Sequence, residues 1–368
     1  MPTLLMLSPA PVLELPGEEL LLDARFVEGM KLHCQFWPGA VTCVLRRGAQ
    51  AIPGGLRFTT ARLGFRAVLL DPGAPLPDGL LESARLIYCA ADDMRHLDLP
   101  RTMRGRVGRV VYSIEQSLGE RLRVALGSPR PVRRRIGAAV WNLRHERRLR
   151  RALAEAAGLH LNGPAAAAAY ARLNPAPLAY LDNRIRQPQL ARQADQTARA
   201  ERLAAGQPLR LVAPGPLDAA SGALDLIEAA FLLRARGLDV RLDILGTGQL
   251  DGRLRDAIAA TGLGPRVCLA GPELTEAARL ARIRTEADLA LIPGRLPEGP
   301  GTAVEIMGCG VPILGRATPG WRRLARDSGG GDALIAASGR ARDFAATTTF
   351  EKVFTARMAH LRALAGLD

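Results

Sequence analysis

Apolar positions in the second half of the chain fall in short runs that alternate with amphipathic stretches. The runs have the length of buried strands, and we expect strands at Leu209–Ala213, Val240–Leu245, Arg266–Ala270, Asp288–Ile292 and Val311–Leu314. The stretches between and after them have a helical period, and we expect helices at Ala220–Arg236, Leu250–Thr261, Thr275–Arg284, Thr302–Cys309 and Glu351–Ala365. This order predicts parallel βαβ units in a doubly wound sheet, which binds ligands beyond the carboxyl ends of its strands.

The first half shows a looser version of the same pattern. Short apolar runs predict strands at Leu4–Leu7, Val41–Leu45, Ala67–Leu70, Arg85–Cys89 and Gly108–Ser113. A helix is expected over Asp23–Trp37, with Asp23 as N-cap and Pro38-Gly39 as the stop. A longer helical pattern covers Arg133–Ala157, and its apolar positions form one predicted face: Ile136, Val140, Leu143, Leu149, Leu153 and Ala156.

The length of 368 residues favours two domains. We expect an N-terminal, acceptor-side Rossmann-like domain over 1–185 and a C-terminal Rossmann-like domain over 208–350, followed by a closing helix over 351–368. Prolines and then a polar stretch predict a linker at 186–207. The predicted fold class is therefore α/β, with two Rossmann-like domains facing an interdomain cleft.

Composition indicates a cytoplasmic globular protein. Hydrophobic residues make up 48% and charged residues 23% of the chain, and no run of about 18 apolar residues occurs. The N-terminus lacks a basic start and is interrupted by prolines, so we expect a strand and loop there and not a secretion signal. The five scattered cysteines predict reduced, mostly buried thiols.

The net charge of +14 is concentrated in one segment. Residues 101–151 hold fifteen arginines against three acidic residues. Three interpretations remain open: a solvated helix face whose apolar side packs on the N-terminal sheet, docking at an anionic membrane surface on the inner face of the membrane, or nucleic acid binding. Nucleic acid is the least favoured, because only Tyr112 and Trp141 could stack on bases there.

Glycine-bearing turns follow the strands expected in the second half. Gly215 follows the first of them, and Gly246 and Gly248 follow the second. Glycine lets the backbone approach a ligand closely, although a Gly-x-Gly after a strand is often only a tight turn. The richest turn, 293–305, places the amides of Gly301 and Thr302 and the carboxylate of Glu305 at one helix start.

These strand ends resemble the nucleotide-sugar-binding domain of family-4 retaining glycosyltransferases, which have the GT-B fold. The succession LRLVAPG, SGALDLIEAA, VRLDILGTGQL, RVCLAG, EADLALIP and PGTAVEIMGCGVPIL carries the resemblance over residues 209–315. It implies a nucleotide-sugar donor and no obligatory metal or other cofactor.

The resemblance also implies roles for individual residues. Glu305 would hold the ribose hydroxyls, and Gly301 and Thr302 would offer amides to the diphosphate. Gly215 would mark the phosphate turn. Gly246 and Gly248 would lie beside the donor, with Gly271 near the base.

Several residues depart from the family pattern. Pro216 and Ser221 stand where relatives carry a basic residue and a lysine, so Ser221 would lie at the donor without charge, and Arg295 could replace the missing cations. Glu298 is one residue closer to Glu305 than the family spacing, so either Glu298 reaches the sugar or Pro297 takes its place.

In the first half, Glu115 stands where many relatives have a histidine that faces the sugar. It is a candidate catalytic carboxylate or an ordinary strand end. Asn162-Gly163 and residues 182–184 fall where the chain approaches the cleft, and for each a turn is favoured over a ligand contact.

The resemblance favours a hexosyltransferase-like enzyme of polysaccharide biosynthesis that acts on a glycan or lipid-linked glycan. The alternative is a catalytically degenerate partner or regulator of another transferase, and a nucleotide-sugar epimerase is a minor third. The donor sugar, its base and the acceptor are not fixed by the residues.

Overall fold

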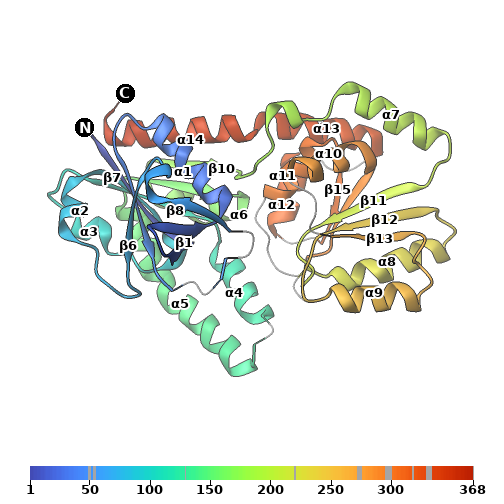
Figure 1. Ribbon diagram of the computed structural model, residues 1–368, viewed down its shortest axis with the longest axis horizontal. Helices are drawn as coiled ribbons and strands as arrows, with labels where there is room; N and C mark the ends of the chain where they lie inside the picture. The colour runs from blue at the N-terminus through green and yellow to red at the C-terminus, as the bar shows by residue number, and fades with distance from the viewer. Residues whose placement is uncertain are drawn as a thin grey trace.

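The computed structural model describes residues 1–48, 51–52, 55–128, 130–218, 221–271, 276–294, 301–316, 319–328 and 334–367. Figure 1 shows two α/β lobes side by side, each built on its own sheet. Arg295, Pro297 and Glu298 lie outside the described residues.

The N-terminal lobe contains a seven-stranded parallel sheet with the order β10-β9-β8-β7-β1-β4-β6. Its strands are β1 (Thr3–Pro11), β4 (Val41–Arg46), β6 (Arg66–Leu70), β7 (Ala84–Ala90), β8 (Arg109–Ile114), β9 (Gly158–Asn162) and β10 (Pro177–Tyr180). A small antiparallel sheet lies beside it, with strands β2 (Leu13–Leu15), β3 (Glu19–Leu22) and β5 (Leu56–Thr59). The helices of this lobe are α1 (Ala24–Phe36), α2 (Asp78–Ser83), α3 (Leu99–Thr102), α4 (Leu118–Gly127), α5 (Val132–Glu155) and α6 (Pro164–Tyr170).

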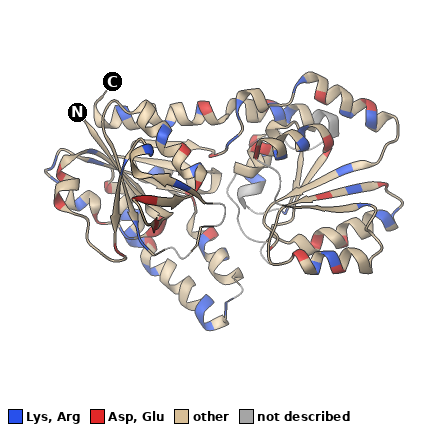
Figure 2. Cartoon of the chain, viewed as in Figure 1, with Lys and Arg blue, Asp and Glu red and all other residues tan. Residues whose placement is uncertain are grey.

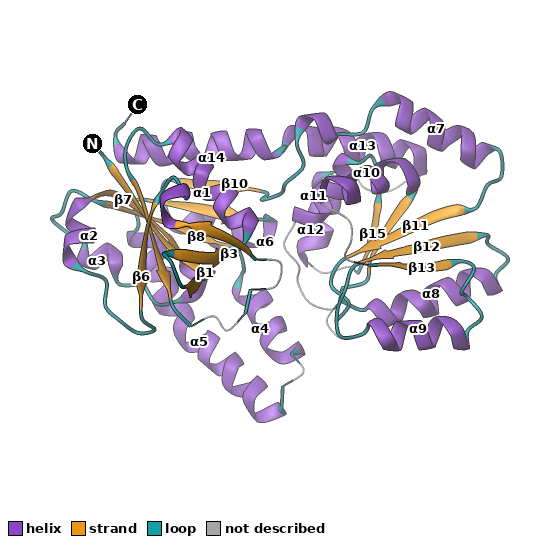
Figure 3. Cartoon of the chain, viewed as in Figure 1, coloured by secondary structure: helices purple, strands orange, loops and turns teal. Residues whose placement is uncertain are grey.

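The C-terminal lobe contains a five-stranded parallel sheet with the order β13-β12-β11-β14-β15 (Figure 3). Its strands are β11 (Leu209–Pro214), β12 (Val240–Leu245), β13 (Val267–Ala270), β14 (Leu289–Ile292) and β15 (Ile313–Gly315). The remaining helices are α7 (Gln193–Ala204), α8 (Ala223–Ala235), α9 (Asp251–Ala260), α10 (Glu276–Glu286), α11 (Gly301–Gly308), α12 (Pro319–Asp327), α13 (Leu334–Thr347) and α14 (Phe350–Ala365). The α/β class and the two Rossmann-like sheets predicted from the sequence are confirmed.

The last helix, α14, returns to the N-terminal lobe. Phe350, Phe354, Met358 and Leu361 are buried in the same core as β1 and β7. The two chain crossings between the lobes lie side by side, since the amide of Phe350 donates to the carbonyl of Ile185 at 2.9 Å. The lobes are thus joined at a double crossing.

Residues 186–207, expected to form a linker, are ordered against the C-terminal lobe. Leu190 belongs to its core, Ala191 is buried, and α7 occupies much of the segment. Arg199 of α7 is buried and donates to the carbonyls of Ala287 (3.0 Å) and Gly310 (2.7 Å). The polar composition gave no indication of this packing, because a buried arginine, and not an apolar stripe, holds α7 against the lobe.

The predicted apolar face of 133–157 is half wrong. Leu149, Leu153 and Ala156 are buried, whereas Ile136 and Leu143 are 54% and 52% exposed. The N-terminal half of α5 extends beyond the sheet together with α4 (Figure 1), so no core is present for that part of the face. None of the helices in the described ranges is long and apolar enough to span a bilayer.

Candidate functional site

The turns after β11 and β12 pack directly against each other. A Cβ atom added at Gly246 would lie 1.8 Å from the carbonyl oxygen of Gly215, and one at Gly248 would lie 2.3 Å from that of Leu217. The amide of Leu217 donates to the carbonyl of Thr247 at 3.0 Å. Gly246 and Gly248 therefore have a structural reason to be glycine, because only a residue without Cβ permits this backbone contact.

Gly246→Ala is expected to lower the free energy of unfolding of the C-terminal lobe by about 1–3 kcal/mol, because the added methyl group overlaps the Gly215 backbone. Urea denaturation followed by circular dichroism measures the change. Gly252→Ala is the matched control: its Cβ meets nothing within 4 Å, and helix propensity favours alanine by up to about 1 kcal/mol. Equal stability of the two variants would contradict the tight packing.

The residues that replace the family's cations are engaged in local structure. The hydroxyl of Ser221 donates to the carbonyl of Asp218 (2.8 Å) and accepts from the amide of Ala223 (3.3 Å). Pro216 lines a small, largely apolar hollow together with Leu226 and Leu291. Neither position supplies positive charge to the carboxyl end of β11.

A cation does lie nearby at a place that sequence reasoning missed. Arg316 follows β15 directly, at the same edge of the sheet, and its side chain is 57% exposed. Its Nη2 atom is 3.7 Å from a carboxylate oxygen of Asp225, in the first turn of α8. An arginine two residues beyond the predicted strand Val311–Leu314 was the available signal.

The start of α11 contacts the segment that enters from the N-terminal lobe. A Cβ atom added at Gly301 would lie 2.8 Å from the carbonyl oxygen of Asp182. Thr302 follows in the first turn of α11, where the backbone amides have no partner within the helix and point out of its N-terminus. The helix N-terminus, which favours anions, is therefore located at the boundary between the lobes.

Glu305 lies at this boundary and is only 5% exposed. Its Oε1 accepts from the backbone amide of Arg184 (3.1 Å), and its Oε2 accepts from the guanidinium of Arg279 (3.0 Å). Burial raises the pKa of Glu305, while the charge of Arg279 opposes the shift. Each oxygen retains capacity for a second hydrogen bond, so a hydroxyl donor can still be accepted.

Glu115 lies at the carboxyl end of β8, beside the ends of β9 and β10. Desolvation raises its pKa, the carboxylate of Asp182 adds to the rise, and a hydrogen bond with Asn162 opposes it. The amide of Asp182 in turn donates to Asn162 Oδ1 at 2.9 Å. Since Asp182 neighbours Glu115 and Arg184 binds Glu305, residues 182–184 connect the two candidate carboxylates.

Arg357 of α14 supports this group from the N-terminal core. Its Nη2 donates to the hydroxyl of Tyr88 at 2.9 Å, and its guanidinium lies 4.4 Å from the ring centre of Tyr180. Its Nη1 is 3.9 Å from Asp182. The closing helix thus places a partly buried positive charge next to the strand ends.

Asp92, after β7, is a further titratable group at these strand ends. Its Oδ2 accepts from the amide of Glu115 at 2.7 Å, and burial raises its pKa to about 6 from 3.8. The folded state thus binds a proton at Asp92 more tightly than the unfolded state does. The proton therefore stabilises the fold at low pH, and this contribution is lost as the pH rises from 3.8 to about 6.

For wild type we therefore expect the free energy of unfolding to fall by about 2–3 kcal/mol over this interval, relative to Asp92→Asn. Urea titrations at a series of pH values test the difference. Asp78→Asn is the control, because the Asp78 side chain is 80% exposed. If Asp78→Asn changed the pH profile as much as Asp92→Asn, the assignment to Asp92 would be wrong.

For two further predicted residues, Gly271 and Gly215, the structure shows the backbone but no contact that indicates a role. Gly271 follows the edge strand β13, and an added Cβ would meet nothing within 4 Å. Gly215 has a φ of 147°, which an alanine would adopt only with strain. In the part of the chain that the structure describes, no three His, Cys, Asp or Glu side chains are grouped to bind a metal ion.

Comparison with known proteins decides the nature of the C-terminal lobe. Residues 208–349 match the family described as Glycosyl transferases group 1. These residues form a group 1 glycosyltransferase domain. The match begins just before β11 and ends just before α14, so the whole five-stranded sheet and the start of α11 belong to the group 1 domain.

Solved structures resemble the whole chain. HepE from Anabaena, in complex with UDP and glucose, has a TM-score of 0.60 at 13% identity and covers 98% of this chain and 99% of that chain. Sucrose-phosphate synthase from Thermosynechococcus elongatus has a TM-score of 0.60 at 16% identity and covers 100% of both chains. The lipopolysaccharide outer core galactosyltransferase WaaB in its apo form has a TM-score of 0.59 at 10% identity, over 99% of each chain.

These likenesses show the GT-B fold. Comparison with curated protein sequences found no match. Together, the fold and the group 1 domain support a glycosyltransferase and confirm that part of the sequence-based expectation. Retention of configuration and membership of family 4 stay predictions.

Proposed function

We propose that this glycosyltransferase moves a sugar from a nucleoside diphosphate sugar to a glycan or lipid-linked glycan, with retention of configuration. The observation that carries the proposal is the position of Glu305 in the group 1 domain. Its carboxylate is buried at the lobe boundary, one turn into the helix whose N-terminus faces the segment from the other lobe. HepE, which has this fold, is described in complex with UDP-glucose.

In this proposal the donor nucleotide lies at the carboxyl ends of β11, β12 and β14. Glu305 accepts hydrogen bonds from the ribose hydroxyls, and the amides of Gly301 and Thr302 contact the diphosphate. Gly271, at the end of β13, lies toward the base. Gly246 and Gly248 keep the adjoining turns closely packed, which shapes the donor side of the boundary.

The leaving diphosphate requires positive charge, because negative charge develops on it as the glycosidic bond breaks. Arg316 is our first candidate, since it is exposed at the same sheet edge and lies 3.7 Å from the carboxylate of Asp225. Arg295, which lies outside the described residues, remains a second candidate. We propose no obligatory metal, because the arginines and helix amides would carry this role.

On the sugar side, we propose Glu115 as the carboxylate that stabilises the oxocarbenium-like transition state. Its location with Asn162 and Asp182, next to the segment that binds Glu305, favours this role over that of an ordinary strand end. Glu298 stays a candidate for a contact with the sugar hydroxyls.

Donor hydrolysis tests the proposal without knowledge of the acceptor. The protein is incubated with UDP-, GDP- and ADP-glucose, and released sugar is followed by proton NMR, which also reports its anomeric configuration. We expect slow hydrolysis of one donor with retained configuration, and a fall of at least about tenfold in Glu115→Gln. Binding of a nucleotide without release of sugar, with any donor or added glycan, would favour the degenerate partner suggested by Pro216 and Ser221.

A further inference from the structure

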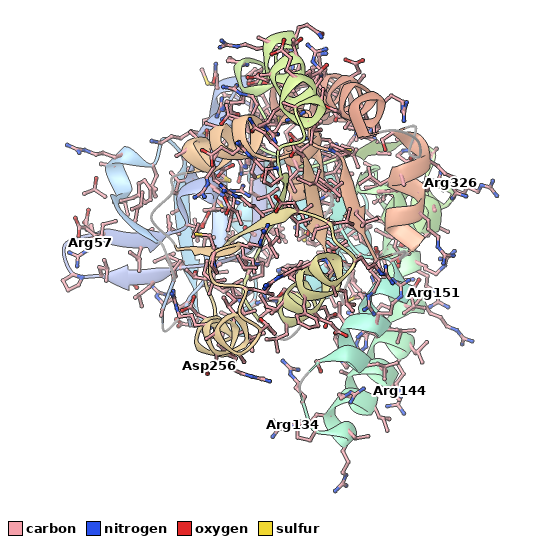
Figure 4. The ribbon with its side chains drawn as sticks, turned by 90° about the vertical axis from the view of Figure 1, so that its right-hand side faces the viewer. Arg57, Arg134, Arg144, Arg151, Asp256 and Arg326 are labelled. Atoms are coloured by element: carbon pink, nitrogen blue, oxygen red, sulfur yellow. The ribbon has the colours of Figure 1, made fainter. Side chains whose placement is uncertain are left out.

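The α4–α5 hairpin extends away from both lobes and exposes apolar side chains. Figures 1 and 4 show the two helices leaving the N-terminal lobe together, with Arg134 and Arg144 on the projecting part. Leu149 and Leu153 anchor the other end of α5 in the core of the lobe. The hairpin therefore projects from the lobe while its base is packed in the core.

The exposed apolar residues of α5 lie on one side of the helix. Val132, Ile136, Val140 and Leu143 are spaced by four, four and three residues, which places them on a single face. Their exposed fractions are 62%, 54%, 38% and 52%. This apolar stripe is about 16 Å long at the rise of an α-helix.

Arginines flank the apolar stripe. Helix α5 contains eight arginines and two glutamates, and one of these glutamates, Glu146, is buried against Arg121 at 2.5 Å. Arg133, Arg144, Arg147 and Arg151 are exposed and form no ion pair with any residue that the structure describes. Figure 2 shows the concentration of basic residues along the hairpin.

We infer that the α4–α5 hairpin docks on the surface of an anionic phospholipid bilayer. An interfacial helix of this kind inserts its apolar face among the headgroups while its cationic flank meets lipid phosphates. The apolar stripe would enter the bilayer surface, and Arg144, Arg147 and Arg151 would lie at phosphate level.

Two other occupants fit these observations less well. A nucleic acid would neutralise the arginines but leave Val132, Ile136, Val140 and Leu143 in water. A second copy of the hairpin would cover the apolar stripe but bring two strongly positive helices together. Of these three occupants, the anionic bilayer satisfies both the apolar stripe and the charge.

The test is flotation of the intact protein with vesicles of phosphatidylcholine, with and without phosphatidylglycerol, at low and high salt. We expect binding only to vesicles that contain phosphatidylglycerol, weakened by salt. The test does not require nucleotide binding, so it is independent of the proposed sugar transfer.

Two triple variants separate the contributions, each with a matched control. Ile136→Ser/Val140→Ser/Leu143→Ser is expected to lower the partition coefficient at least about tenfold. Its control replaces three comparably exposed residues of the other lobe by serine: Phe231 (47%), Leu232 (48%) and Leu238 (52%). Arg144→Gln/Arg147→Gln/Arg151→Gln is expected to lower the partition coefficient about a hundredfold. Its control removes the same number of charges from the other lobe and is Arg236→Gln/Arg241→Gln/Arg253→Gln.

Four results would overturn the inference. The first is no binding to phosphatidylglycerol vesicles at low salt. The second is equal loss of binding in the controls, which would indicate adsorption by overall charge or apolarity. The third is a wild-type oligomer that the serine variant dissociates. The fourth is single-stranded RNA binding that depends on the same arginines, in the absence of vesicle binding.

Discussion

Replacing Glu305 by alanine is expected to weaken binding of the preferred nucleotide about 100-fold. The carboxylate would lose its charge-assisted hydrogen bonds to the ribose hydroxyls, and each such bond contributes about 1.5–3 kcal/mol. Glu305→Gln keeps the volume and one acceptor oxygen, so a smaller loss of about tenfold is expected. Isothermal calorimetry with UDP, GDP and ADP measures both values.

The folded structure must be checked in the same variants, because Glu305 also accepts from Arg184 and Arg279. The control is Glu276→Gln, which removes a neighbouring carboxylate that pairs with Arg25 at 2.7 Å. We expect Glu276→Gln to bind nucleotide like wild type. Unchanged affinity in a well-folded Glu305→Ala would refute the ribose-binding role.

Asp288→Ala is expected to lower the free energy of unfolding of the C-terminal lobe by about 3–5 kcal/mol. Asp288 is completely buried and accepts hydrogen bonds from Arg202 and from the amide of Arg210, the latter at 2.8 Å. Its loss would leave the guanidinium of Arg202, and that of Arg199 at 3.8 Å, without a buried countercharge. Urea denaturation measures the change.

Asp239→Ala provides the comparison in the same lobe. Asp239 also pairs with an arginine, Arg266, but the two side chains are 53% and 40% exposed. Exposed pairs contribute about 1 kcal/mol at most. A loss as small as this in Asp288→Ala would mean that the buried ion pair does not hold α7 to the lobe.

The strands and most helices of the C-terminal lobe followed from the sequence because each element carries its own period. The expected strand Val240–Leu245 is β12, and the expected helix Leu250–Thr261 is α9 with slightly shorter ends. The predicted N-cap of α1 is also confirmed, since the side chain of Asp23 accepts a hydrogen bond from the amide of Phe26 at 3.0 Å.

Two helices show where the pattern of apolar residues was insufficient. Helix α7 was missed because its anchor is a buried arginine, Arg199, and polar residues carry no periodic signal for burial. Helix α5 was found, but its apolar residues were assigned to one core face. Ile136 and Leu149 have the same hydrophobic character, but the helical period places them about 140° apart around α5, and only Leu149 is buried in the core.

The candidate site could be predicted in part. The strand-end glycines and Glu305 were located from local motifs, and the structure places them along one sheet edge and the lobe boundary. The contribution of residues 182–184 could not be predicted, because it depends on a contact between segments more than a hundred residues apart. Those residues were expected near the cleft, as a turn in preference to a ligand contact.

A crystal structure of the protein with its preferred nucleotide diphosphate tests the central claim most directly. We expect the ribose hydroxyls within hydrogen-bonding distance of Glu305 and the diphosphate at the amides of Gly301 and Thr302. A nucleotide bound elsewhere, with Glu305 still contacting only Arg184 and Arg279, would contradict it.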